Sequence, residues 1–546
     1  MNYLSMISIK NKINANQLVI LVGLYMTFIL NIPFLSRVYD AIVTQEIYNL
    51  PFLISVPFLL LSLVIIFLTL FSIKYVLKAA LIFLTIYSSL LFYSTLTYGI
   101  VFDYGMLQNI FETNSAEAFS YFNLYAMFFI FFTGILPSLI IAQFKITYKP
   151  LLPELFSRLK VLLPALLMLF IIAFVYYSNY AAVGRNNRGV EKYLIPFQSV
   201  ASTIHYVKKK HFSRPLTFSL IDSAPVLKIT ESTERTVTVL VVGETARAKN
   251  YSLNGYEKNT NRHTENLPLI SFKNVFSCGT ATAVSVPCMF SAMTKHSYDD
   301  REVSYQQNLL DISKLAGMDV LWIDNSDGCK GVCNRVPTMK IDPKSDNPLC
   351  DNVYCFDMAL LAPFKEKLHS SNAQDTLIVL HLIGSHGPTY YRRYPDEHKA
   401  FTPDCPRSDI QNCSEEELVN TYDNTITYSD FVLSKVISEL SQYNEDNTSV
   451  SKRINTSVLY ISDHGESLGE AGAYLHGFPY SLAPVEQIHI PMLFWSNYIE
   501  TSSDSCLSNL ADNLYSHDNL FHTMLGLVNI DSKAYIQDLD IFSACK

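Results

Sequence analysis

The chain has 546 residues, of which 49% are hydrophobic and only 16% are charged, with a mean hydropathy of +0.18 and a formal net charge of −8. A soluble enzyme of this length carries about 25% charged residues, so part of the chain is expected in lipid. The aromatic content, the 19 glycines and the lack of heptads exclude a disordered, collagen-like or coiled-coil protein.

The first 180 residues are poor in charge. They carry 15 of the 90 charged side chains and none of the His or Cys residues. Five apolar windows within them are long enough for a membrane-spanning helix, which needs roughly 20 residues. The predicted spans are 17–35, 51–72, 79–98, 121–143 and 161–177. More spans and no small-residue cleavage site follow the first one, so we expect a retained anchor and not a signal peptide.

The positions of Lys and Arg predict the orientation of these spans. Basic residues cluster before the first span and in the second and fourth connections, whereas the first connection has only Arg37 and the third, 99–120, has none. The N-terminus is therefore expected in the cytoplasm, and five crossings place the chain after Tyr177 outside. The acidic outer part argues against a nucleic-acid partner.

All ten cysteines lie in the outer part, as expected for disulfides in an oxidising compartment. Their irregular spacings, without a CxxC, disfavour a zinc ribbon. Four pairs are close in sequence, which leaves Cys506 with Cys545, although proximity alone does not fix the pairing. The four are Cys278–Cys288, Cys329–Cys333, Cys350–Cys355 and Cys405–Cys413.

We expect residues 1–180 to form a transmembrane domain and residues 216–546 a globular domain, joined by a connecting segment, 181–215. This segment holds a semi-apolar piece, 193–207, followed by three lysines, 208–210. It fits a helix at the lipid headgroups, with the lysines facing anionic lipids. A solvated linker is the alternative.

Four short apolar runs of the globular domain end in polar residues suited to a metal or phosphate. They are 237–242, 319–323, 376–383 and 457–461. Runs rich in β-branched residues predict buried parallel strands, and the intervening stretches are long enough for crossover helices. In such sheets ligands bind at the carboxyl ends of the strands, which is where these polar residues fall.

The strongest metal candidates are Glu244, after the first run, and Asp463 and His464, after the last. Two carboxylates and an imidazole suit Zn²⁺ with an open position. A single carboxylate after a strand is equally typical of a helix cap. The adjacent Asp and His are more specific, because two such side chains need a reason to be buried together.

Two histidines and a threonine extend this candidate site. His386, in GlySerHisGlyPro, and His476, in TyrLeuHisGly, are predicted at the same sheet edge, with an ordinary core or surface histidine as the alternative. The run from Cys278 to Cys288 supplies the candidate nucleophile, because pairing of these two cysteines would hold a hydroxyl of the run against the metal. Such a hydroxyl needs a metal to favour the alkoxide. The run alone equally fits a stapled helix start capped by Thr282.

Four motifs carry a resemblance to a known family. They are ValGlyGluThrAlaArg from Val242, CysGlyThrAlaThr from Cys278, GlySerHisGlyPro from Gly384 and SerAspHisGlyGluSerLeuGly from Ser462. With them, nearly the whole chain resembles the lipid A phosphoethanolamine transferases of Gram-negative bacteria, including the mobile colistin-resistance enzymes, in the alkaline phosphatase and sulfatase superfamily. The resemblance implies five transmembrane helices followed by an α/β alkaline-phosphatase-like domain with a central, mostly parallel sheet.

The resemblance also implies roles for single residues. Thr282 would be the nucleophile that becomes phosphoethanolaminylated, and His386 and His476 would contact the donor phosphate or a second zinc. The implied zinc ligands are Glu244, Thr282, Asp463 and His464. The implied donor and substrate contacts are Asn109, Thr113, Glu117, Asn325, Lys330, His386 and His476. The first three of these repeat along one helical face, for which an exposed polar face is the alternative; for Lys330 it is a solvated loop charge.

The implied reaction has two steps, in an inner-membrane protein whose zinc-dependent catalytic domain, 216–546, lies in the periplasm. Thr282 attacks phosphatidylethanolamine and releases diacylglycerol, and a phosphate of lipid A then takes up the adduct. The product hides anionic phosphate, which predicts weaker binding of polymyxin and other cationic peptides.

Other activities remain as alternatives. A phosphoglycerol or core-sugar phosphoethanolamine transferase would share the superfamily, although the dense disulfide set would be unusual in the Gram-positive cells that make lipoteichoic acid. A sulfatase is disfavoured, because no Arg follows the Thr282 segment in the sulfatase pattern. A non-enzymatic receptor with a zinc-stabilised outer domain predicts zinc without turnover.

Overall fold

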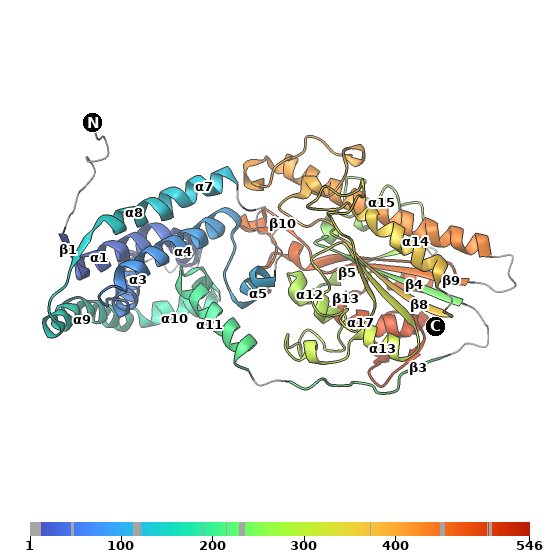
Figure 1. Cartoon of the computed structure of the whole chain (residues 1–546), viewed down its shortest axis with the longest axis horizontal. Coiled ribbons are helices and arrows are strands. Elements are labelled where there is room, and N and C mark those ends of the chain that lie inside the picture. Colours follow the sequence, from blue (N-terminus) through green and yellow to red (C-terminus); the bar gives the residue numbers. More distant parts are fainter. Residues whose placement is uncertain are drawn as a thin grey trace. The chain divides into compact units, whose positions relative to one another are not determined.

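The computed structural model describes residues 12–44, 49–112, 121, 123–187, 189–213, 216–228, 235–371, 373–447, 454–499, 501 and 505–545. They fall into two compact units, taken in turn below (Figure 1). The helical unit lies within Met1–Leu107 and Phe122–Phe212. The sheet unit lies within Gln108–Tyr121 and Ser213–Lys546.

The helical unit is built from apolar helices. They are α1 (Ala15–Tyr25), α2 (Ile32–Thr44), α3 (Leu50–Leu70), α4 (Leu77–Tyr98), α7 (Leu124–Ile130), α8 (Leu136–Gln143), α9 (Leu151–Val175), α10 (Tyr177–Asn186) and α11 (Phe197–His211). Helix α5 (Tyr104–Glu112) crosses the boundary between the units. Strands β1 (Lys12–Asn14) and β2 (Lys145–Thr147) pair in parallel.

Among the described residues, four helices are long and apolar enough to cross a membrane: Leu50–Leu70, Leu77–Tyr98, Leu124–Gln143 and Leu151–Val175. The bent pair Ala15–Leu30 and Ile32–Val43 makes a fifth span if it is counted as one. These helices agree with the predicted membrane part. The last begins ten residues before the predicted start, because Arg158 is accommodated by hydrogen bonding to Asn16 (2.7 Å).

The first predicted span is a broken helix, with a bend of 57°. Helix α1 passes into a π-helical turn, Met26–Leu30, and the break falls at Asn31. The buried Asn31 amide donates to the Met26 carbonyl (2.9 Å) and to the Ile195 carbonyl (2.7 Å). The side chain thereby satisfies a carbonyl that the interrupted helix leaves free.

The connecting segment contains α11, which ends with Lys208, Lys209 and Lys210 in its last turn. Cations at this end of a helix are favourable, because the unpaired carbonyls there carry partial negative charge. The helix covers most of the predicted semi-apolar piece. That it lies at the lipid headgroups stays a prediction.

The sheet unit is centred on eight strands in the order β13-β5-β12-β9-β4-β8-β6-β7. Their bounds are β4 (Arg235–Gly243), β5 (Leu269–Phe276), β6 (Asp319–Asp324), β7 (Thr338–Lys340), β8 (Asp375–His381), β9 (Ile454–Ser462), β12 (His489–Ser496) and β13 (Leu514–Ser516). Strand β12 runs antiparallel to β5 and β9, and the other pairings in this sheet are parallel. The mostly parallel sheet is confirmed.

Helices cover both faces of this sheet (Figure 1). Helices α12 (Thr282–Met289), α13 (Leu309–Leu315) and α17 (His517–Leu527) lie on one face, and α14 (Leu361–Ser370) and α15 (Glu415–Asn447) on the other. The smaller elements are α16 (Cys506–Leu510), β3 (Val226–Leu227), β14 (Ile530–Asp531), β10 (Ser467–Leu468) and β11 (Tyr474–Leu475).

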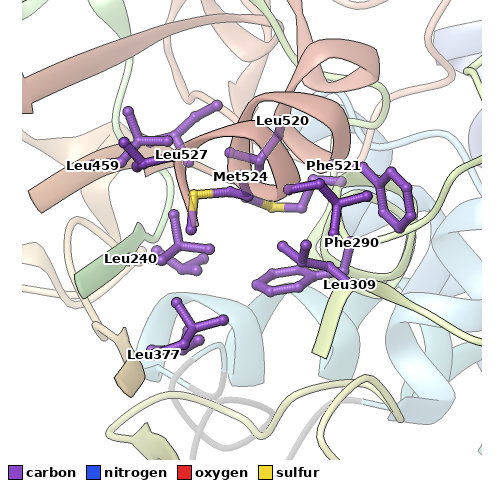
Figure 2. Close-up of a cluster of buried hydrophobic side chains, with 14 of the residues drawn as sticks. Leu240, Phe290, Leu309, Leu377, Leu459, Leu520, Phe521, Met524 and Leu527 are labelled. Carbon is purple, nitrogen blue, oxygen red and sulfur yellow. The ribbon is translucent and has the colours of Figure 1, made fainter. Parts of the chain in front are cut away.

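The core between the sheet and α17 is apolar and closely packed. Figure 2 shows Leu240 and Leu459 of the sheet facing Met524 and the neighbouring side chains of α17. These side chains are buried to 5% exposure or less, and burying each contributes about 1.5–3 kcal/mol. This packing fixes α17 on the sheet.

All five predicted disulfides are present: Cys278–Cys288, Cys329–Cys333, Cys350–Cys355, Cys405–Cys413 and Cys506–Cys545. The described part of the chain leaves no cysteine free. The two partners of a pair are at most 39 residues apart in sequence, so each bridge closes a local loop.

Candidate metal centre and nucleophile

The metal candidates meet where strands β4 and β9 end. In the parallel register Gly243 lies beside Ser462, so the next residues, Glu244 and Asp463, emerge at the same edge. The Asp463 amide donates to the Gly243 carbonyl (2.9 Å). The ligand atoms of Glu244, Asp463 and His464 lie within 4.8 Å of one another, and all three side chains are buried.

The turn after β8 supports Glu244 from the other side. The Ser385 amide donates to the Glu244 carbonyl (2.9 Å). The preceding residue is Gly384, with φ +50°, where a Cβ atom would lie 2.6 Å from that carbonyl oxygen. Only glycine permits both the backbone angle and this close approach.

Thr282 is the first residue of α12, and its hydroxyl points at this cluster. Its Oγ1 lies 3.1 Å from both carboxylate oxygens of Glu244 and 3.4 Å from Nε2 of His464. The preceding segment is fixed by the Thr280 hydroxyl, which donates to the Phe478 carbonyl (2.6 Å). The N-terminal end of α12 carries partial positive charge, which favours an anionic oxygen at this position.

The two buried carboxylates of the cluster favour a positive charge beside them. Burial and the neighbouring Glu244 raise the pKa of Asp463 to about 6. Although burial alone would lower the pKa of His464, the two carboxylates raise it to about 10. Burial likewise opposes charge on Glu244. The hydrogen bond with His464 and the charges of the surrounding histidines nevertheless lower the pKa of Glu244 overall. Either an imidazolium or a metal cation satisfies this demand.

His386 and His476 lie beside the cluster. The His476 ring centroid is 4.5 Å from that of His464 and 5.1 Å from that of His386. Nδ1 of His476 is 2.8 Å from Glu466, whose carboxylate also accepts from the Tyr390 hydroxyl. Burial lowers the pKa of His386 well below its usual value, so this ring is neutral at pH 7.

The remaining sequence candidates are placed differently. The Asn325 amide donates to the Cys355 carbonyl (3.0 Å) and to Asp357 (2.8 Å), so its Nδ2 is engaged in loop structure. Lys330 is half-buried and donates to a neighbouring carbonyl (3.3 Å). Asn109 lies half-buried on α5. Thr113 and Glu117 lie outside the described residues.

Sequence reasoning missed His381, a neighbour of Glu244, and noted Ser326 only as a polar residue after its strand. His381, the last residue of β8, is fully buried, with Nδ1 2.9 Å from Asp324 and Nε2 3.9 Å from Glu244. The Ser326 hydroxyl lies 3.5 Å from the same carboxylate. The signal for His381 was a histidine inside an otherwise apolar strand, since a buried imidazole needs a polar partner.

Comparisons with known proteins support the same division of the chain. Residues 60–211 match the family model "Phosphoethanolamine transferase EptA/EptB", and residues 236–530 match "Sulfatase". Phosphoethanolamine transferase EptA of Escherichia coli K12 is 38% identical over 96% of both chains, and phosphatidylethanolamine transferase Mcr-1 of Escherichia coli is 34% identical over 94% of both.

A solved structure resembles the whole chain. It is the integral membrane protein lipooligosaccharide phosphoethanolamine transferase A from Neisseria meningitidis, with a TM-score of 0.91 and 35% identity. The match covers 98% of this chain and 100% of that one. The similarity therefore extends over both units.

Proposed function

Because the chain belongs to the phosphoethanolamine transferase family, we propose that it moves phosphoethanolamine from phosphatidylethanolamine to a phosphate of lipid A through a covalent adduct on Thr282. The observation that carries the proposal is the Thr282 hydroxyl, buried 3.1 Å from the Glu244 carboxylate. Relatives named for phosphatidylethanolamine and lipooligosaccharide support this donor and acceptor.

The donor set fits zinc, which would be held by Glu244, Thr282, Asp463 and His464. Tetrahedral zinc with ligands at about 2.0–2.2 Å requires donor atoms about 3.3–3.6 Å apart. Nε2 of His464 lies 3.4 Å from Glu244, 3.4 Å from Thr282 and 3.5 Å from Asp463. Among the described residues, Oδ2 of Asp463 is buried without a hydrogen-bond partner, as expected of a ligand atom. Zinc would supply positive charge for the Thr282 oxygen and the substrate phosphate.

In the first step the Thr282 oxygen attacks the phosphorus of the donor. The new Oγ1–P bond forms as the P–O bond to diacylglycerol breaks. The Glu244 carboxylate, 3.1 Å away, accepts the hydroxyl hydrogen bond, holds the oxygen in line and takes up the Thr282 proton as the new bond forms. The leaving diacylglycerol oxygen takes a proton, for which His476 is placed, because Glu466 binds its Nδ1 and leaves Nε2 for the substrate.

In the second step a phosphate oxygen of lipid A attacks the phosphorus of the adduct. The Oγ1–P bond breaks, and Glu244 returns the proton to Thr282. The neutral His386 is suited to accept a hydrogen bond from the incoming group, whose proton passes to the neighbouring His476 and restores it for the next cycle. The chain would work in the inner membrane with its sheet unit in the periplasm, and the product would reduce polymyxin binding.

The experiment uses the purified full chain with fluorescent phosphatidylethanolamine and lipid A in mixed vesicles. We expect diacylglycerol release, and a mass gain of one phosphoethanolamine group on lipid A. Thr282→Ala serves as the inactive control. Zinc binding without diacylglycerol release would exclude the transferase function and favour the receptor, and a modified core sugar with unmodified lipid A phosphates would correct the acceptor.

A further inference from the structure

Helix α17 begins beside the candidate site although none of its residues belongs to the ligand set. Ser516 caps its N-terminus, and His517 is its first residue, with 1% of its surface exposed. The next turns pack on the sheet through Leu520, Phe521 and Met524 (Figure 2). The position of His517 relative to the strands is therefore set by the core.

The His517 ring bridges the two halves of the site. The Cys278 amide donates to its Nδ1 (3.2 Å), and its Nε2 lies 3.0 Å from the Ser462 carbonyl. Cys278 starts the segment that leads to Thr282, and Ser462 is bonded directly to Asp463. One side chain thus connects the nucleophile segment with the strand end that carries the metal candidates.

These two bonds specify one tautomer. Because Nδ1 accepts from a backbone N–H, it carries no proton, and Nε2 must carry the proton that it donates to the carbonyl. Burial lowers the pKa of His517 to about 4, so the neutral ring persists at pH 7. The two backbone groups therefore require a side chain with an acceptor and a donor as far apart as the two nitrogens of an imidazole.

The nucleophile segment has other attachments as well. The Ser277 amide donates to the Ile488 carbonyl (2.8 Å), and the Thr280 hydroxyl donates to the Phe478 carbonyl (2.6 Å). After α12, the Lys295 amide donates to Asp518 of α17 (2.7 Å). The segment therefore has enough anchors to stay folded without His517, and what the ring adds is its alignment with β9.

We propose that His517 is a positioning residue that sets the distance between the Thr282 hydroxyl and the Asp463–His464 pair. The inference rests on the proposed function, since it concerns the alignment of that nucleophile. A misplacement of about 1 Å in a reacting group costs about 10²-fold in rate. Loss of the bridge therefore lowers kcat, while substrate binding by other residues is preserved.

The test compares three substitutions at His517 with a matched control on the same helix. His517→Phe keeps the ring and loses both bonds, His517→Asn keeps an acceptor near Nδ1, and His517→Gln keeps a donor near Nε2. The control is His522→Phe, because His522 is also buried on α17 and accepts a backbone N–H, that of Ile536 (3.1 Å), through Nδ1.

Diacylglycerol release from phosphatidylethanolamine is measured at pH 7 with the full-length protein. We expect kcat to fall about 10²-fold in His517→Phe and about 10-fold in the Asn and Gln variants, with KM changed less than about 3-fold. His522→Phe should keep kcat within about 2-fold, although its melting temperature should fall by about as much as that of His517→Phe. Zinc content, measured by mass spectrometry, should stay at the wild-type level in all four.

The outcomes separate the two proposals. An inactive wild type would overturn the proposed function and this inference with it. An active wild type with equal kcat in His517→Phe and His522→Phe would overturn the inference alone, and so would zinc loss that accounts for the lower kcat. ¹⁵N NMR of labelled protein gives an independent check: an Nδ1-protonated His517 would contradict the bridge.

Discussion

Thr282 owes its position to three segments that meet from distant parts of the chain. Its oxygen faces a carboxylate from the end of β4 and an imidazole from the end of β9, while its own helix supplies partial positive charge. A threonine hydroxyl is a weak nucleophile, so its activity depends on these surroundings. Two predictions follow from this at the level of single residues.

Thr282→Ala should remove the reaction without unfolding the protein. The substitution deletes the attacking oxygen but leaves Glu244, Asp463 and His464 in place, so transfer should fall at least about 10³-fold. Peptide mass spectrometry of the wild type should find phosphoethanolamine on Thr282, and Thr282→Ser should retain part of the activity. An adduct on Thr280 would show that the wrong threonine has been chosen.

Asp463→Asn should lose zinc although it nearly preserves shape. An amide replaces a charged ligand atom in a site with few ligands, so zinc affinity should drop by more than about 10-fold. Metal analysis after dialysis against a chelator measures this, and zinc should restore transfer to the stripped wild type. His476→Ala is the control, expected to keep most of its zinc. Full zinc occupancy in Asp463→Asn would remove Asp463 from the ligand set.

At the scale of elements, the turn after β8 and the helix α17 position the site from outside it. The turn presses Gly384 against the Glu244 backbone, and α17 holds His517 between two segments. Both depend on close contacts that a small change disturbs.

Gly384→Ala should displace Glu244. The new Cβ would lie 2.6 Å from the Glu244 carbonyl oxygen, and the backbone there has φ +50°. Gly255→Ala is the matched control, because its φ is +98° but no atom lies within 4 Å of the added carbon. Both variants should lose about 1 kcal/mol from backbone strain. Zinc titration should show weaker binding in Gly384→Ala alone, and equal affinities would contradict the displacement.

His522 should make folding stability depend on pH. Burial lowers its pKa to about 4 in the folded protein, whereas an unfolded histidine titrates near 6.5. The unfolded state thus binds the proton first, so stability is greatest above pH 6.5 and falls as the pH drops toward 4. His522→Phe should lose less stability over this range. Thermal unfolding of metal-free protein at pH 7 and pH 4.5 measures it, and equal losses in both proteins would contradict the assignment.

At the scale of the whole molecule, the proposed reaction requires that a lipid reach the candidate site of the sheet unit. The connection 99–120, which we expect on the outer side, carries Asp103, Glu112 and Glu117 but no basic residue, while the headgroup of the proposed donor ends in a cationic amine. A carboxylate at the membrane surface would attract that amine.

Glu117→Ala should therefore impair turnover of phosphatidylethanolamine in vesicles by about 10-fold, while hydrolysis of a soluble phosphoethanolamine ester stays unchanged. Glu112→Ala is the control, since it removes a carboxylate from the same connection that is not among the implied donor contacts. Equal lipid turnover in the two variants at matched expression would contradict a role in donor binding and would favour an ordinary exposed polar face.

The sequence alone determined what depends on local pattern. Long apolar windows, β-branched runs and cysteines a few residues apart each report on neighbouring residues, which is why the membrane helices, the buried strands and four of the five disulfides could be expected. The candidate site was found in outline because parallel strands end at one sheet edge. The roles of its residues came from the motifs.

Tertiary structure decided what depends on contacts between distant segments. The break at Asn31 and the pairing of His381 with Asp324 require partners that no local period specifies. The bridge from His517 to Cys278 joins residues 239 positions apart in the chain. Such bonds form only after the core has packed α17 against the sheet, because a hydrogen bond acts over a few ångströms. A bond between distant segments therefore leaves no local pattern in the sequence.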